Sequence, residues 1–122
     1  AYVHARRARE GVPGALADLE RAITRMRPIV KWRTYAAHLP VLEASWALAR
    51  GDGATALTLL ERAEHLAVRD DHASALFETY LVRAYAYTWL DKPLYARLAR
   101  VAAETLAREL GWFGRLERIA KS

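Results

Sequence analysis

Histidines and carboxylates are the residues of this chain with the clearest capacity for acid–base or metal chemistry. Of the four histidines only His65 and His72 lie close together in the sequence, with Asp70 and Asp71 between them. Imidazole and carboxylate groups at such a spacing can bind a divalent metal. A helix that ends near residue 69, followed by one that Asp70 or Asp71 caps, explains the same residues without a metal. We favour the capping interpretation and expect no metal.

Other kinds of catalytic site also lack the residues they need. Ser45 and Ser74 have no base at a recognisable spacing, and a nucleophile needs an oriented partner. The glycine-containing segments 11–14 and 51–53 lack the Lys-Ser/Thr pair of a phosphate-binding loop. The chain has no cysteine, which excludes disulfides, thiol catalysis and thiolate metal sites, and a reducing cytoplasm is the simplest location. We therefore expect no enzyme and no cofactor.

The net charge of +5 is concentrated in the first third of the chain. Residues 1–40 carry eight basic and three acidic side chains, whereas residues 41–122 carry eleven of each. Two interpretations stay open: a solvated or domain-contacting basic face, which we favour, and a nucleic-acid or polyanion site that uses Arg21, Arg25 and Arg27. No apolar run approaches the length of about 18 residues that a membrane span needs, so we expect no membrane partner.

An internal repeat organises the 122 residues into helical hairpins. Residues 15–22 (ALADLERA) return as residues 56–63 (ALTLLERA), with six of eight positions identical. Turn signals at 11–14, 51–53 and 91–93 are about 40 residues apart, and apolar residues recur at spacings of three and four. We predict helices at about 1–10, 14–27, 30–50, 54–69, 71–90, 93–110 and 112–120, with Asp91 capping the sixth. Pro40 should kink the third helix or mark a break after Leu39.

The second helix of each hairpin resembles the tetratricopeptide repeat. The resemblance rests on Gly51-Asp52 at the turn, followed by Ala56-Leu57, Leu60 and Ala63. The unit of about 40 residues is longer than the standard unit of about 34 and is similar to the extended repeats of MalT-like bacterial regulators. The resemblance implies one all-α domain over residues 1–122, a right-handed α-α superhelix of about three stacked units with a short C-terminal capping helix.

The resemblance also implies a function without catalysis. We expect a protein–protein interaction or sensor scaffold of a larger cytoplasmic bacterial signal-transduction or transcription regulator. The first residue is not methionine and residues 1–10 already have a helical pattern, so we expect this chain to be part of that longer protein. The partner would be a protein, a peptide or another domain of the same parent chain, while the oligomeric state stays open.

In such stacks the first helix of each hairpin lines the concave side, here residues 30–50 and 71–90. Polar and aromatic side chains on these two helices have no obvious place in a core, so we predict that they bind the partner. Tyr85 and Trp89 would be its apolar anchors, although burial between hairpins explains both residues equally well. The predicted partner-binding residues are Arg33, His38, Glu78, Arg83, Tyr85 and Trp89.

Overall fold

The computed structural model describes residues 2–29 and 36–121, and these residues form helices joined by short turns. The first part contains α1 (Tyr2–Arg9), α2 (Ala15–Met26) and the short 3-10 helix η1 (Arg27–Ile29). The second part contains α4 (His38–Ala49), α5 (Gly53–Arg69), α6 (Ala73–Trp89), α7 (Pro93–Glu109) and α8 (Phe113–Lys121). The described residues contain no strand, so the prediction of an all-α protein is confirmed.

One type of turn recurs at the helix ends. The second residue after the helix adopts a left-handed backbone, and the residue that follows it donates its N–H to a carbonyl five positions earlier. Examples are His72 to Ala67 and Lys92 to Tyr87, both at 2.8 Å. This pattern satisfies carbonyls that a helix end would otherwise leave without donors. The left-handed positions are Gly11, Gly51, Asp71, Asp91 and Gly111. From residue 51 onward they are 20 residues apart, so α5, α6 and α7 each have 17 residues.

These turns correct the predicted helix caps. Asp71 and Asp91 hold the left-handed positions, with φ of 51° and 58°, and cap no helix. The N-cap of α6 is His72, whose ring accepts from the backbone of Ala75, and the N-cap of α7 is Lys92. Pro40 lies in the first turn of α4, where backbone N–H groups have no carbonyl within the helix to bond to. Its missing N–H therefore costs no helical hydrogen bond, and Pro40 does not kink α4. The earlier part of the predicted helix, at 30–35, lies outside the described residues.

Small residues allow the helices to pack closely. The central core lies between α4, α5 and α6, and five of its nine buried members are alanine. Ala56 and Ala63 of the repeated octapeptide are fully buried there with Leu60. A second core joins α1, α2 and α4 around Leu19 and Leu42. A third joins Phe77 of α6 to α7 and α8.

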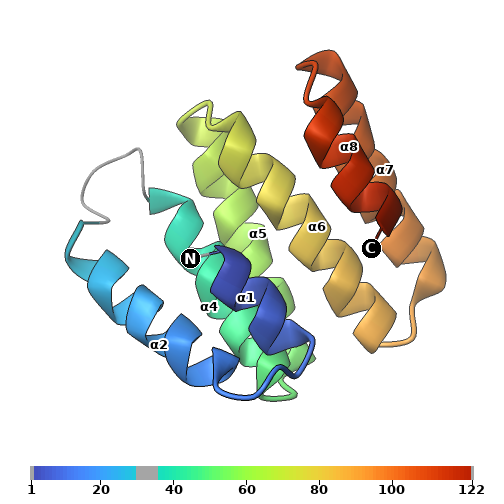
Figure 1. The fold of residues 1–122 in the computed structure, drawn as a ribbon. Helices are drawn as coiled ribbons and strands as arrows, with labels where there is room; N and C mark the ends of the chain where they lie inside the picture. Colours follow the sequence, from blue (N-terminus) through green and yellow to red (C-terminus); the bar gives the residue numbers. More distant parts are fainter. Residues whose placement is uncertain (1, 30–35, 122) are drawn as a thin grey trace.

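Each helix packs mainly against its neighbours in the chain. Contacts join α1 to α2, α4 to α5 and α6 to α7 as hairpins, and α2 to α4 and α5 to α6 between hairpins. The first helices also meet one another, α1 with α4 and α4 with α6. Figure 1 shows α1 and α8 on the same side of the row, with α6 between them. None of the described helices has the length and apolar character that a membrane crossing requires.

Candidate functional site

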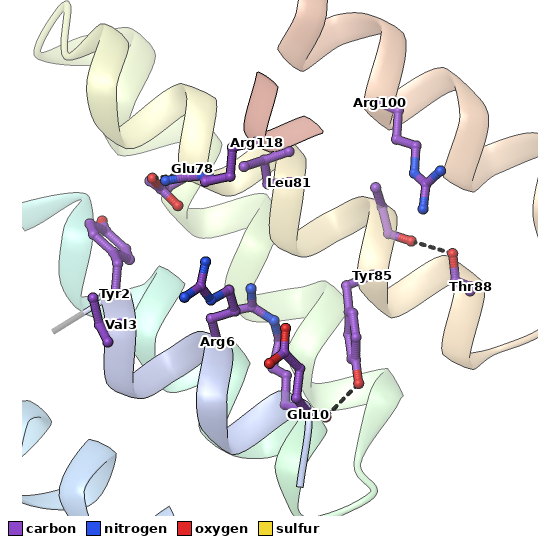
Figure 2. Close-up of a pocket in the computed structure, with 12 residues that line it drawn as sticks. Tyr2, Val3, Arg6, Glu10, Glu78, Leu81, Tyr85, Thr88, Arg100 and Arg118 are labelled. Atoms are coloured by element: carbon purple, nitrogen blue, oxygen red, sulfur yellow. Dashed lines mark hydrogen bonds and ion pairs between the residues drawn. The ribbon is translucent and has the colours of Figure 1, made fainter. Parts of the chain in front are cut away.

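A cavity of about 430 Å³ opens between α1 and α6, with Arg100 contributed by α7 and Arg118 by α8. Tyr2 and Val3 line it from α1, while Leu81 and Tyr85 line it from α6 (Figure 2). These residues make its surface largely apolar and aromatic. A concave surface of this kind with a few charged groups is the usual form of a binding site.

The charged groups of the cavity are predominantly basic. They are Arg6, Arg9, Arg100 and Arg118, together with Glu10 and Glu78. Among the described residues, no ion pair joins Arg6 or Arg100 to a carboxylate. The cavity therefore has two more positive than negative charges, and two of its guanidinium groups stay available for an anionic ligand.

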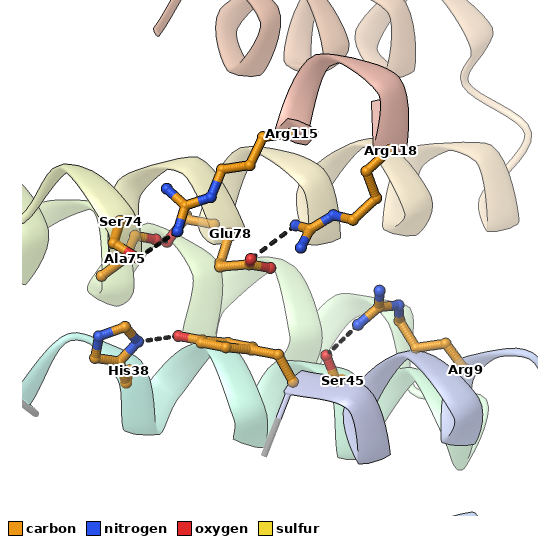
Figure 3. A network of polar contacts seen from close by, with 10 residues as sticks. Arg9, His38, Ser45, Ser74, Ala75, Glu78, Arg115 and Arg118 are labelled. Carbon is orange, nitrogen blue, oxygen red and sulfur yellow. Dashed lines mark hydrogen bonds and ion pairs between the residues drawn. The ribbon is translucent and has the colours of Figure 1, made fainter. Parts of the chain in front are cut away.

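Glu78 is a buried carboxylate on α6, with 7% of its surface exposed. Arg118 of α8 donates from Nη2 to its Oε1 at 2.7 Å (Figure 3). Burying a carboxylate is costly unless a cation and hydrogen bonds compensate it. Burial raises the pKa of the Tyr2 phenol, and the nearby Glu78 charge raises it further, so this hydroxyl stays protonated. The Glu78–Arg118 pair thus joins α6 to α8 at the rim of the cavity.

Arg9 and Tyr85 close the opposite end of the cavity. The Tyr85 hydroxyl donates to the backbone carbonyl of Arg9 at the end of α1. The Arg9 side chain donates from Nη1 to Ser45 Oγ at 2.8 Å and lies 5.4 Å from the centre of the Tyr85 ring. Burial lowers the pKa of Arg9. Its buried Nε has no acceptor among the described residues, which adds a donor beside the cavity.

A chain of imidazoles runs beside Tyr2. His72 Nδ1 accepts from the Ala75 N–H at 3.3 Å, so the proton of the neutral His72 ring is on Nε2. His72 Nε2 then donates to His38 Nε2 at 3.1 Å, and His38 Nδ1 donates to the Tyr2 hydroxyl. Burial, with a smaller contribution from His72, lowers the pKa of His38 to about 4. Protonation of His38 would place its Nε2–H against the Nε2–H of His72. This hydrogen bond therefore requires a neutral His38.

The structure brings together three of the six predicted partner-binding residues. Glu78 and Tyr85 line the cavity, and His38 contacts Tyr2 at its edge. Arg83 lies outside the lining and pairs with Glu64 of α5 at 3.2 Å.

The other two predicted residues do not join this cavity. Trp89 is 50% exposed and lies near Gly53, at the far end of α6. Arg33 lies outside the described residues. The predicted role of the set in binding a partner stays a prediction.

A second cavity, of about 780 Å³, lies between α2, α4 and α5. Its basic groups already have partners: Arg27 lies 3.5 Å from Glu43, and Arg50 stacks 4.6 Å from the centre of a Trp46 ring. Among the basic residues of the first third, Arg6 and Arg9 line the first cavity and Arg27 lines the second. We take the first cavity as the candidate site because two of its arginines are unpaired within the described residues.

Apart from Glu78 and Tyr85, the residues that line the cavity were not identified from the sequence, among them Tyr2, Arg6, Arg100 and Arg118. One available signal was Glu78, which falls at the spacing of the buried residues Ala75, Val82 and Ala86 of α6. A carboxylate at core spacing needs a cation nearby. Arg118 supplies this cation because α8 packs against α6. Local periodicity does not encode that packing.

No cluster of three or more metal-binding side chains occurs in the part of the chain that the structure describes. His65 is exposed on α5, and His72 contacts His38 instead. Comparison with protein-family models, with curated proteins and with solved structures finds no match for this chain.

Proposed function

We propose that this chain is a non-enzymatic interaction module that binds an acidic segment of a partner protein in the cavity between α1 and α6. The observation that carries the proposal is that Arg6 and Arg100, which have no carboxylate partner among the described residues, lie beside the aromatic surface of Tyr2 and Tyr85. An extended segment with alternating acidic and apolar side chains would complement both features.

The wider part of the proposal is a right-handed stack of tetratricopeptide-like hairpins. It is supported by the repeated octapeptide and by the contacts of each hairpin with the first helix of the next. In this arrangement α1, α4, α6 and α8 are the first helices, and three of them line the cavity. A place in a larger cytoplasmic bacterial regulator rests on the resemblance of the repeats.

Peptide binding tests this function. A fluorescent eight-residue peptide of alternating Glu and Leu should bind, and the same peptide with Lys in place of Glu should not. Arg6→Ala and Arg100→Ala should each weaken binding about five-fold, which corresponds to about 1 kcal/mol. Arg62→Ala, on the exposed face of α5 away from the cavity, is the matched control. Equal affinity for both peptides would contradict the proposal.

The nucleic-acid alternative is tested in the same assay. Random duplex DNA should compete weakly, and its binding should fall steeply with added salt, because each neutralised phosphate releases counterions. If DNA binds at physiological salt and the triple substitution Arg21→Ala, Arg25→Ala and Arg27→Ala removes that binding, the polyanion function replaces the proposed one.

A further inference from the structure

Arg9 lines the cavity from the last position of α1 and is partly buried. Among the described residues, no ion pair joins it to a carboxylate. Its position differs from that of Arg6 and Arg100, which are exposed and keep most of their contact with water. A cation that loses water on folding needs an anion or hydrogen-bond acceptors in exchange. The surroundings of Arg9 therefore have to be examined for such groups.

The hydrogen bonds of Arg9 leave most of its donors unused. A guanidinium carries five N–H donors. In the part of the chain that the structure describes, its acceptor is Ser45 Oγ, which receives a hydrogen bond from Nη1 at 2.8 Å (Figure 3). Nε is buried and has no acceptor there. The ring of Tyr85 lies 5.4 Å away and attracts the cation through its face, but it does not replace the missing oxygen acceptors.

The neighbouring carboxylate does not neutralise Arg9 either. Glu78 Oε1 already accepts from Arg118 Nη2 at 2.7 Å. Burial lowers the pKa of Arg9, and the charge of Glu78 opposes this shift without cancelling it. One carboxylate therefore lies close to two guanidinium groups, and a positive charge at the end of the cavity stays uncompensated.

We propose that Arg9 is an oxyanion-binding position at the Tyr85 end of the cavity. Its planar guanidinium can donate two parallel hydrogen bonds to a carboxylate or a phosphate group. Arg6 lies one helical turn earlier on α1 and also lines the cavity, so it adds a second positive charge to the same wall. The identity of the ligand rests on the proposed function, in which an acidic side chain of the bound segment supplies the oxyanion. A phosphate ester would offer the same chemistry.

Thermal unfolding with inorganic phosphate tests the position without a partner protein. Phosphate should raise the Tm of the unmodified chain in a saturable way relative to sodium chloride at equal ionic strength, because an ion that binds only the folded chain stabilises it. The variant R9M/S45A removes the guanidinium together with its acceptor, so neither group is left unpaired. In chloride its Tm should equal or exceed that of the unmodified chain, and its additional response to phosphate should be lost.

Arg7→Met is the matched control for the loss of one positive charge from α1. Arg7 is exposed and does not line the cavity. This variant should therefore keep the full response to phosphate. Comparison with R9M/S45A also removes the general effect of phosphate on protein stability, which does not depend on a site.

The peptide of alternating Glu and Leu tests the source of the oxyanion. R9M/S45A should bind it about ten-fold more weakly than the unmodified chain, as expected for the loss of a charge-assisted hydrogen bond, and Arg7→Met should bind it normally. A second peptide, with one Glu replaced by phosphoserine, separates the two sources. Its tighter binding, if R9M/S45A abolishes the difference, would identify a phosphate ester as the preferred group.

The two assays separate this inference from the proposed function. If phosphate does not raise the Tm of the unmodified chain, or raises that of R9M/S45A equally, Arg9 is not an oxyanion position. Peptide binding that is the same in R9M/S45A would also overturn the inference, while the proposed function would stand. A phosphate response that depends on Arg9 in a chain that binds neither peptide would support the inference and contradict the proposed function.

Discussion

The low pKa of His38 predicts that protonation of this side chain contributes to destabilisation of the fold by acid. The pKa of about 4 in the folded chain lies below the value of 6.5 in the unfolded chain. As the pH falls through 6.5, the unfolded chain therefore binds a proton at His38 before the folded chain does. The contribution of neutral His38 to stability is complete above about pH 6.5 and is lost progressively between about pH 6.5 and 4.

The size of the effect follows from the shift. The folded and unfolded pKa values of His38 differ by about 2.5 units. Because each unit corresponds to 1.36 kcal/mol, the free energy of unfolding can fall by at most about 3 kcal/mol through this group. The His38 ring is partly exposed, so solvent screening reduces this to about 2 kcal/mol. The loss should be visible in urea unfolding at pH 7.5, 6, 5 and 4.5. Carboxylates also titrate in this range, so a variant without the imidazole is needed as reference.

His38→Gln supplies that reference. It should lower the free energy of unfolding at pH 7.5, and the two stability curves should converge toward pH 4.5, because the reference has no imidazole to protonate. His65→Gln, an exposed position on α5, controls for the loss of an imidazole elsewhere. In proton nuclear magnetic resonance the His38 ring should titrate near pH 4. Parallel stability curves, or titration of His38 near pH 6.5, would refute the explanation by burial and the His72 contact.

Three further substitutions test the packing and the turns. Gly53→Ala should destabilise the chain by about 1 kcal/mol in thermal unfolding, because a Cβ there would lie 2.9 Å from the Leu90 side chain. Asp91→Gly should stabilise it by about 0.5–1 kcal/mol in the same measurement, since glycine adopts the left-handed backbone without steric cost. Arg118→Ala should cost about 3 kcal/mol in urea unfolding by leaving the Glu78 carboxylate buried without a cation, and adding Glu78→Gln should recover most of the loss.

Each of these substitutions has an internal comparison. Gly114→Ala adds a Cβ into open space within a helix and should not destabilise the chain. Asp52→Gly, unlike Asp91→Gly, removes a carboxylate that accepts from the Thr55 N–H at 3.1 Å at the start of α5, so it should destabilise. An equal effect of the two aspartate substitutions would contradict the distinct roles given to these turn residues. An Arg118→Ala loss that Glu78→Gln does not reduce would contradict the buried-charge explanation.

Local signals in the sequence account for most of the helices and for few of the turn details. The recurrence of small and apolar residues in α5 reflects burial against neighbouring helices, so it predicted where the helix lies. Asp71 and Asp91 were misassigned because aspartate is suited both to an N-cap and to a left-handed turn residue one position earlier. The side chain that actually caps α6, His72, is an uncommon choice for that role.

Only a small part of the cavity lining could be predicted, because its residues come from helices far apart in the sequence. Glu78 and Tyr85 lie seven residues apart on one helix, so their shared face could be inferred from spacing. Arg9 and Arg118 reach the same place from α1 and α8, through hydrogen bonds that span 76 and 40 residues of sequence. The register between such distant helices is decided by how the cores pack, and no local pattern records it.

The Tyr85–Arg9 contact has a consequence for the order in which the molecule folds. Most contacts join helices that are neighbours in the chain, and such local contacts form quickly. Helices α1 and α8 have only eight and nine residues, too few to be stable alone. They should therefore dock last and open first, which hydrogen exchange would show as faster exchange there than in α4, α5 and α6. Because both helices wall the cavity, a ligand that fills it would also suppress the fluctuations of the two ends of the chain.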